Sequence, residues 1–108
     1  MELIILFTIL IIVIDIVTGI LKGIKQKEFD SAKLRKGGLN KSGELIVIIL
    51  SYLLDIALPK FKISLDFKVC FVSCSYLFFM ELCSIIENLG AINPDLIPPQ
   101  LSDIFKKL

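Results

Sequence analysis

The residues of this chain most able to do chemistry are acidic side chains placed within or beside long apolar runs. They are Asp15, Glu44, Asp55, Glu81 and Glu87. A carboxylate at membrane depth costs about 3 kcal/mol on insertion scales, and such groups usually face a bundle interior or a water-filled cavity. Polar partners for these acids are therefore expected on the same helix faces or on neighbouring chains.

The elements that position these acids are predicted to be membrane helices. The chain has 108 residues, 56 % of them hydrophobic, and a mean hydropathy of +0.85. Its first apolar run, Leu3 to Leu21, would be about 28 Å long as a helix, close to a hydrocarbon core of about 30 Å. We predict an all-α integral membrane protein, oligomeric, with a single domain over 1–108. Three transmembrane helices are expected at about 3–24, 44–61 and 67–89, with a basic loop at 25–43 and a C-terminal tail at 90–108.

The second run is the weakest of the three spanning candidates. Ser51, Asp55, Pro59 and Lys60 interrupt it, and a tilted interfacial helix is the alternative. Pro59 predicts the end of this helix. Gly90 is expected to cap the third helix, because glycine commonly follows a helix C-terminus, and Pro94 blocks its continuation.

Polar residues recur at helical spacing on each predicted helix, so each has one polar face and an apolar back. The expected pore-facing or interface residues are Asp15, Thr18, Gly19, Gly23, Glu44, Ser51, Asp55, Glu81, Ser84, Glu87 and Asn88. Gly19 and Gly23 form a small-xxx-small pair, which suits close helix approach. Asp15 and Glu81 are predicted at the same depth, and the shortage of buried bases favours neighbouring subunits or water as their complement.

Basic residues gather between the first two apolar runs. The predicted cytoplasmic basic loop carries Lys22, Lys25, Lys27, Lys33, Arg35, Lys36 and Lys41. The positive-inside rule then places the N-terminus outside and the C-terminus in the cytoplasm. Within this loop, residues 30–36 are a candidate short helix capped by Asp30 or Ser31. The net charge of +1 gives no overall attraction for nucleic acid, and membrane lipid is the expected contact.

Catalytic, cofactor and metal chemistry are not expected. The chain has no His, and Cys70, Cys74 and Cys83 do not have the spacing of a zinc or redox site. Small polarizable residues packed in a helix are the simpler interpretation of these cysteines. The first apolar run is interpreted as a retained helix rather than a signal peptide, because Glu2 precedes it and Lys22-Gly23-Ile24-Lys25 follows it.

Four stretches together resemble the small phage-lysis and toxin-secretion holins, including the clostridial toxin-associated group. They are Asp15-Ile16-Val17-Thr18-Gly19 with Ile20-Leu21-Lys22, Ser31 with Gly37-Gly38-Leu39-Asn40-Lys41, Leu53-Leu54-Asp55, and Glu81 with Ser84-Ile85-Ile86-Glu87-Asn88, Gly90 and Pro94. The chain departs from the pattern at Gly23, where Ala is expected, and in its short tail. The resemblance implies a non-enzymatic homo-oligomer of the bacterial cytoplasmic membrane, which forms lesions that release a cell-wall hydrolase (endolysin) or a large protein toxin. It also implies that collapse of the membrane potential is the usual trigger.

Three other interpretations stay open. The chain is alternatively an antiholin or a small membrane adaptor subunit; if it is itself a holin, an antiholin is a candidate partner. The intramembrane acids also suit a small ion- or proton-conducting channel. Finally, each acid taken singly is explained by protonation, or by hydrogen bonds that fix helix register.

Overall fold

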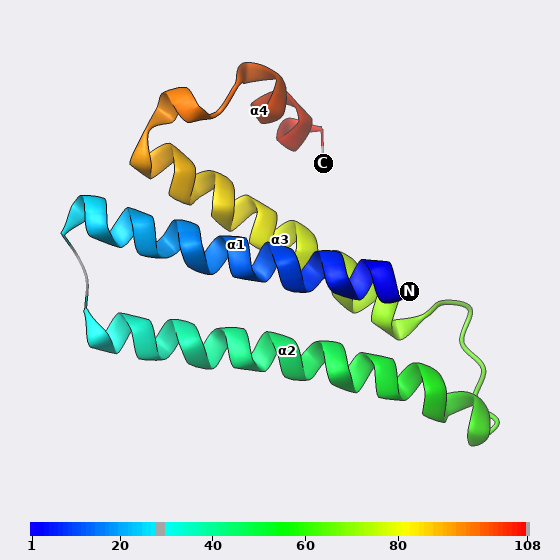
Figure 1. Cartoon of the computed structure of the whole chain (residues 1–108). Helices are drawn as coiled ribbons and strands as arrows, with labels where there is room; N and C mark the ends of the chain where they lie inside the picture. The colour runs from blue at the N-terminus through cyan, green and yellow to red at the C-terminus, as the bar shows by residue number, and fades with distance from the viewer. Residues whose placement is uncertain (28–29, 108) are drawn as a thin grey trace.

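A computed structural model describes residues 1–27 and 30–107 as a chain of helices (Figure 1). These are α1 (Glu2–Gln26), α2 (Ser31–Lys60), α3 (Val69–Ile92), the 3-10 helix η1 (Pro94–Leu96) and α4 (Pro99–Lys106). No strand occurs in the described ranges, and three of their helices are long and apolar enough to cross a membrane. The predicted all-α class with three candidate transmembrane helices is therefore confirmed.

Helix α1 buries one narrow stripe along its length. The buried residues are Thr8, Ile11, Ile12, Asp15 and Thr18, which follow the three-and-four spacing of a single helix face. The Thr8 hydroxyl donates to the Ile4 carbonyl at 2.7 Å, so this hydroxyl has a partner within its own helix. The helix ends where Lys27 adopts a left-handed conformation with φ 55°.

Helix α2 begins well before the predicted residue 44. The candidate short helix at 30–36 with its cap at Asp30 is confirmed as the first turns of α2, and the prediction of a loop is wrong for residues 37–43. The Asp30 side chain caps the helix by accepting the Ala32 amide at 3.0 Å. The three glycines at 37, 38 and 43 suggested a turn, because glycine weakens a helix by about 1 kcal/mol relative to alanine. The Asp30 cap, together with the contacts that Lys41 and Ser51 make to the other helices, offsets that cost. Residues 28 and 29 of the predicted loop lie outside the described part of the chain.

Helix α3 is held at both ends by charged side chains of other helices. Asp55 of α2 accepts the Val69 and Cys70 amides at 2.7 and 2.9 Å. At the other end, the Lys25 ammonium of α1 donates to the carbonyls of Ala91 and Ile92. An acid at a helix N-terminus and a base at its C-terminus both complement the helix dipole.

The predicted cap at Gly90 is wrong, because α3 continues through it to Ile92. Asn93 ends the helix instead, and its side chain accepts the Asp95 amide at the start of η1. A Cβ at Gly90 would lie 3.4 Å from Ile97 Cδ1. The glycine therefore makes room for the chain that folds back from α3, and the predicted tail contains η1 and α4.

Helices α1 and α3 lie side by side, and α2 runs back along them (Figure 1). A small buried cluster of Ile12, Ile48, Cys70, Cys74 and Leu77 joins the three helices. The outward faces are apolar, and most large hydrophobic side chains are exposed. An exposed apolar surface of this extent suits lipid rather than water.

Candidate functional site

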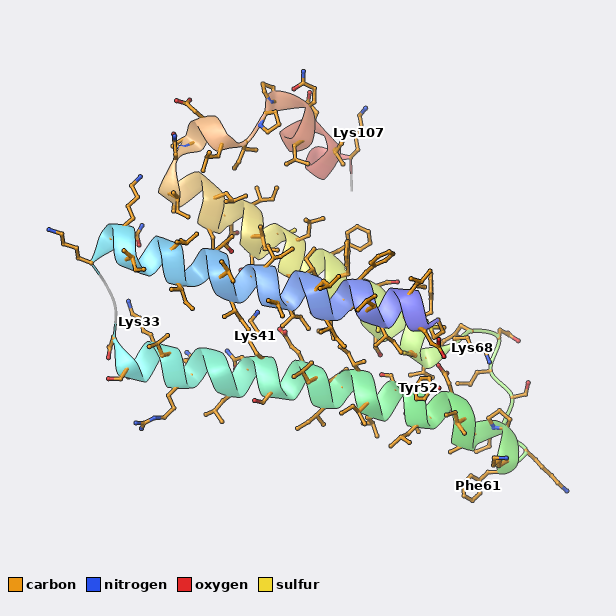
Figure 2. All side chains as sticks on the ribbon, in the orientation of Figure 1. Lys33, Lys41, Tyr52, Phe61, Lys68 and Lys107 are labelled. Carbon is orange, nitrogen blue, oxygen red and sulfur yellow. The ribbon has the colours of Figure 1, made fainter. Side chains whose placement is uncertain are left out.

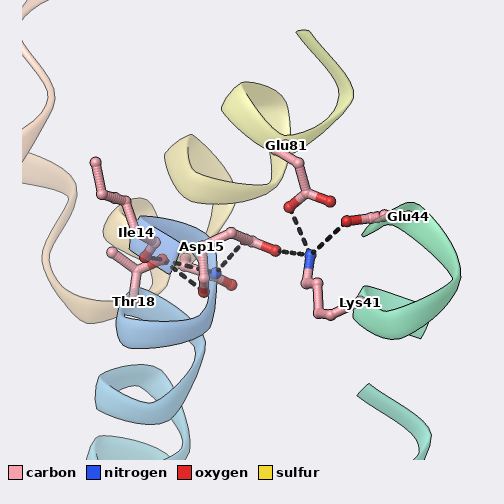
Figure 3. A network of polar contacts seen from close by, with 7 residues as sticks. Ile14, Asp15, Thr18, Lys41, Glu44 and Glu81 are labelled. Atoms are coloured by element: carbon pink, nitrogen blue, oxygen red, sulfur yellow. Dashed lines mark hydrogen bonds and ion pairs between the residues drawn. The ribbon is translucent and has the colours of Figure 1, made fainter. Parts of the chain in front are cut away.

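The centre of the polar interior is Lys41, whose side chain reaches from α2 toward α1 and α3 (Figure 2). Its Nζ lies 2.5 Å from Asp15 Oδ2, 2.5 Å from Glu81 Oε2 and 3.8 Å from Glu44 Oε2 (Figure 3). Glu81 is only 2 % exposed and Asp15 7 %. One ammonium group thus binds carboxylates from all three long helices; we call these four residues the Lys41 cluster.

Asp15 has a second set of partners on its other side. Asn88 Nδ2 donates to Asp15 Oδ1 at 3.2 Å and to Thr18 Oγ1 at 3.1 Å. The Thr18 hydroxyl itself donates to the Ile14 and Asp15 carbonyls within α1. Both oxygens of a nearly buried carboxylate are therefore hydrogen-bonded, and this network joins α1 to α3.

A second polar contact joins α2 to α3 further along the bundle. The Ser51 hydroxyl, which is buried, donates to Ser73 Oγ at 2.7 Å. One turn later Asp55 is half-buried and binds the first amides of α3. In this structure Asp55 acts as a helix cap.

The remaining predicted polar residues are less tightly placed. Gly23 and Ser84 are half-buried and line the cavity described below, whereas Glu87 is exposed. A Cβ at Gly19 would lie 3.8 Å from Asn88 Nδ2, which is ordinary van der Waals contact. Gly19 therefore faces α3 at an approach that does not require glycine.

The basic residues do not share one loop. Lys22 and Lys25 are on α1 and Lys27 follows it, whereas Lys33, Arg35, Lys36 and Lys41 are on α2. Of these seven, Lys41 joins the cluster and Lys25 binds the end of α3. Arg35 and Lys36 are exposed.

A cavity of about 500 Å³ separates α1 from the first turns of α2. Its mouth is lined by Lys22, Lys33 and Asp30, and its inner end reaches Asp15 and Lys41. We call this cavity the α1–α2 groove. Figure 2 shows the Lys33 side chain directed from the start of α2 toward the end of α1.

The Lys41 cluster contains more carboxylates than ammonium groups. Three carboxylates face one ammonium group, so full ionisation would leave excess negative charge in an interior that is poor in water. Among the described side chains, Glu44 Oε2 is buried without a hydrogen bond. A proton, water or a group from another chain is needed to complete the cluster.

Lys41 is the residue of the cluster that sequence reasoning misplaced, since it was assigned to a loop. The spacing Lys41, Glu44, Ile48, Ser51, Asp55 continues the polar face of α2 backward by one turn. That three-and-four pattern is the signal that identifies it. The expected shortage of buried bases agrees with this cluster, in which three acids share one base. Ser73, the partner of Ser51, lies on the same helix face as Glu81, Ser84 and Asn88 by its helical spacing.

Comparison with known proteins agrees with the resemblance noted above. No curated protein and no solved structure gives a match. The family model described as the bacteriophage holin family matches residues 1–108, the whole chain. Together with three helices able to cross a membrane within the described ranges, this match makes the chain a holin-like membrane protein, and it belongs to the bacteriophage holin family.

Proposed function

We propose that the chain oligomerises in the bacterial cytoplasmic membrane and forms lesions that release an endolysin or a protein toxin. The observation that carries the proposal is the Lys41 cluster, in which a polar side of each long helix turns inward while the opposite sides are apolar. Such a chain is compatible with lipid as a single copy. It also holds the polar groups that a water-filled lumen requires.

Helix α2 is the element we expect to exchange partners during assembly. Its polar contacts to the other two helices include the Lys41 ion pairs, the Ser51–Ser73 bond and the Asp55 cap. Interhelical hydrogen bonds in membranes average only about 0.6 kcal/mol, because the separated helices find other partners. Replacing these contacts with equivalent ones to a neighbouring chain therefore costs little, and the polar faces then border water.

The proposed topology places the N-terminus outside and the C-terminus in the cytoplasm. The ends that carry Lys22, Lys25, Lys27, Lys33, Arg35 and Lys36 would lie at the cytoplasmic surface. Single cysteines at exposed Leu65 and exposed Lys36 test this with a membrane-impermeant thiol reagent on intact cells, in a chain whose native cysteines are replaced. Labelling at position 65 alone supports the topology, and labelling at position 36 alone reverses it.

Inducible expression tests the function itself. With a cytosolic muralytic enzyme present, induction should stop growth abruptly and lyse the culture, and without the enzyme the cells should lose viability but keep their walls. Continued growth with verified membrane insertion contradicts the proposal. A chain that lyses nothing but delays lysis by another holin would be an antiholin, and the adaptor interpretation predicts neither effect.

A small ion- or proton-conducting channel is the second candidate, and the excess of carboxylates over bases in the Lys41 cluster favours it. In that case Asp15→Asn should abolish conductance in reconstituted vesicles while the helices and the assembly stay intact. The holin proposal instead predicts efflux of large solutes such as a labelled dextran. Ion flux without dextran release would favour the channel.

A further inference from the structure

The α1–α2 groove combines a basic mouth with apolar walls. Lys22 and Lys33 lie on opposite helices at its mouth, and Ile16, Ile20 and Leu34 line its sides. These three apolar residues are also exposed on the outer surface of the bundle. The groove is therefore accessible from the position that lipid would occupy around the helices.

The size and charge of the groove suit a headgroup. Its volume of about 500 Å³ falls within the range of small-molecule pockets. Of the acids that line it, Asp15 is paired with Lys41, whereas Asp30 keeps its charge while it accepts the amide of Ala32. The lysines at the mouth, Lys22 and Lys33, outnumber the one carboxylate there, Asp30, so this end of the groove carries an excess of positive charge.

We propose that the α1–α2 groove binds one anionic phospholipid, with the phosphodiester between Lys22 and Lys33 and an acyl chain along Ile16 and Ile20. Basic pockets between membrane helices at the cytoplasmic side commonly hold anionic lipid headgroups. The inference rests on the membrane location and topology proposed above. A bound lipid would occupy the space between α1 and the start of α2.

A second copy of the chain is a poorer occupant of the same groove. The end of the bundle around the mouth also carries Lys27, Arg35 and Lys36, which are exposed. Another copy inserted at the same depth would bring its own lysines against these groups. Like charges repel at that distance, whereas an anionic headgroup is attracted.

Native mass spectrometry of the full-length protein, released from bilayer nanodiscs, tests the proposal. The nanodiscs contain phosphatidylglycerol and phosphatidylcholine in equal amounts. The expected result is one retained phosphatidylglycerol per chain, preferred over phosphatidylcholine by about tenfold or more. Free glycerol 3-phosphate should not displace it, because the acyl chain contributes to binding.

Two pairs of variants separate the groove from the rest of the basic surface. Lys22→Gln with Lys33→Gln should abolish the preference, whereas Arg35→Gln with Lys36→Gln removes the same charge outside the groove and should keep it. Gly37→Leu should also block retention, because Gly37 lines the groove and a Cβ there meets open space. Gly43→Leu is its control, since it too has open space but lies outside the groove.

Several results would overturn the inference. Equal retention of both lipids, or equal losses in the two charge variants, would show general surface attraction. Displacement by glycerol 3-phosphate would show a free-anion site. If Gly37→Leu changes the oligomeric state and leaves lipid retention unaltered, a second copy occupies the groove. Lipid retention is measured without lysis, so the lipid-site proposal and the lesion proposal can be contradicted independently of each other.

Discussion

The ammonium of Lys41 lies 2.5 Å from the carboxylate of Glu81, a residue that is only 2 % exposed, and the pair joins α2 to α3 inside the bundle. Asp15 of α1 shares the same ammonium group. Lys41 is thus the one described base that contacts all three long helices through side chains. Removing it should affect the whole bundle rather than a single contact.

We expect Lys41→Met to destabilise the bundle by about 3–5 kcal/mol, because it leaves buried carboxylates without their cation. The measurement is unfolding in detergent followed by circular dichroism. Lys36→Met is the control, since Lys36 is exposed on the same helix. Adding Asp15→Asn and Glu81→Gln to Lys41→Met should recover most of the loss. Equal stability of the Lys41 and Lys36 variants would contradict the ion-pair account.

Ser51 and Ser73 should show a measurable but small coupling. A double-mutant cycle of Ser51→Ala and Ser73→Ala is expected to give about 0.6 kcal/mol, the average for interhelical hydrogen bonds in a membrane protein. The same unfolding assay measures it. Ser42→Ala paired with Ser73→Ala is the reference cycle, because the Ser42 hydroxyl bonds within its own helix. A coupling energy of zero would show that the Ser51–Ser73 hydrogen bond does not stabilise the α2–α3 interface.

Asp55→Ala should fray the start of α3, because Asp55 accepts the Val69 and Cys70 amides. Loss of a helix cap costs about 1 kcal/mol. Hydrogen exchange at residues 69 and 70 should accelerate accordingly, by about fivefold for that free energy. Asp66→Ala, in the exposed connector, should leave both amides unchanged. Unaltered protection in the Asp55 variant would mean that α3 is capped in another way.

Gly19→Ala should be tolerated and should stabilise α1 by up to about 1 kcal/mol, because alanine favours a helix and the new Cβ meets Asn88 at ordinary contact distance. This outcome differs from the close approach that the small-xxx-small spacing suggested. Unfolding of the variant measures the change. A loss of more than 1 kcal/mol would mean that the two helices approach more closely than this structure has them.

The sequence predicts the parts of the fold that depend on local pattern. The apolar runs and the polar spacing around Asp15 and Glu81 identify the membrane helices and their inward faces. The sequence did not predict the full extent of α2, because three glycines lower the helix propensity of residues 37–43 by more than one N-terminal cap raises it. The ion pairs of Lys41 with Asp15 and Glu81 act across 26 and 40 residues of sequence, and no local rule includes them. The roles of Asp55 and Lys25 at the ends of α3 were missed for the same reason.

The central claim is that the polar faces are closed in the single chain and border water in the lesion. Ser51→Cys tests it most directly, because Ser51 is only 4 % exposed and lies midway along the apolar part of α2. The measurement is labelling by a charged, membrane-impermeant thiol reagent before and after lysis is triggered, in a chain whose native cysteines are replaced. Leu50→Cys, on the exposed apolar face, is the control and should stay unlabelled throughout. We predict that Ser51→Cys is unreactive before triggering and is labelled afterwards. The account is contradicted if Ser51→Cys stays unlabelled in cells that lyse, or if it is already labelled before they do.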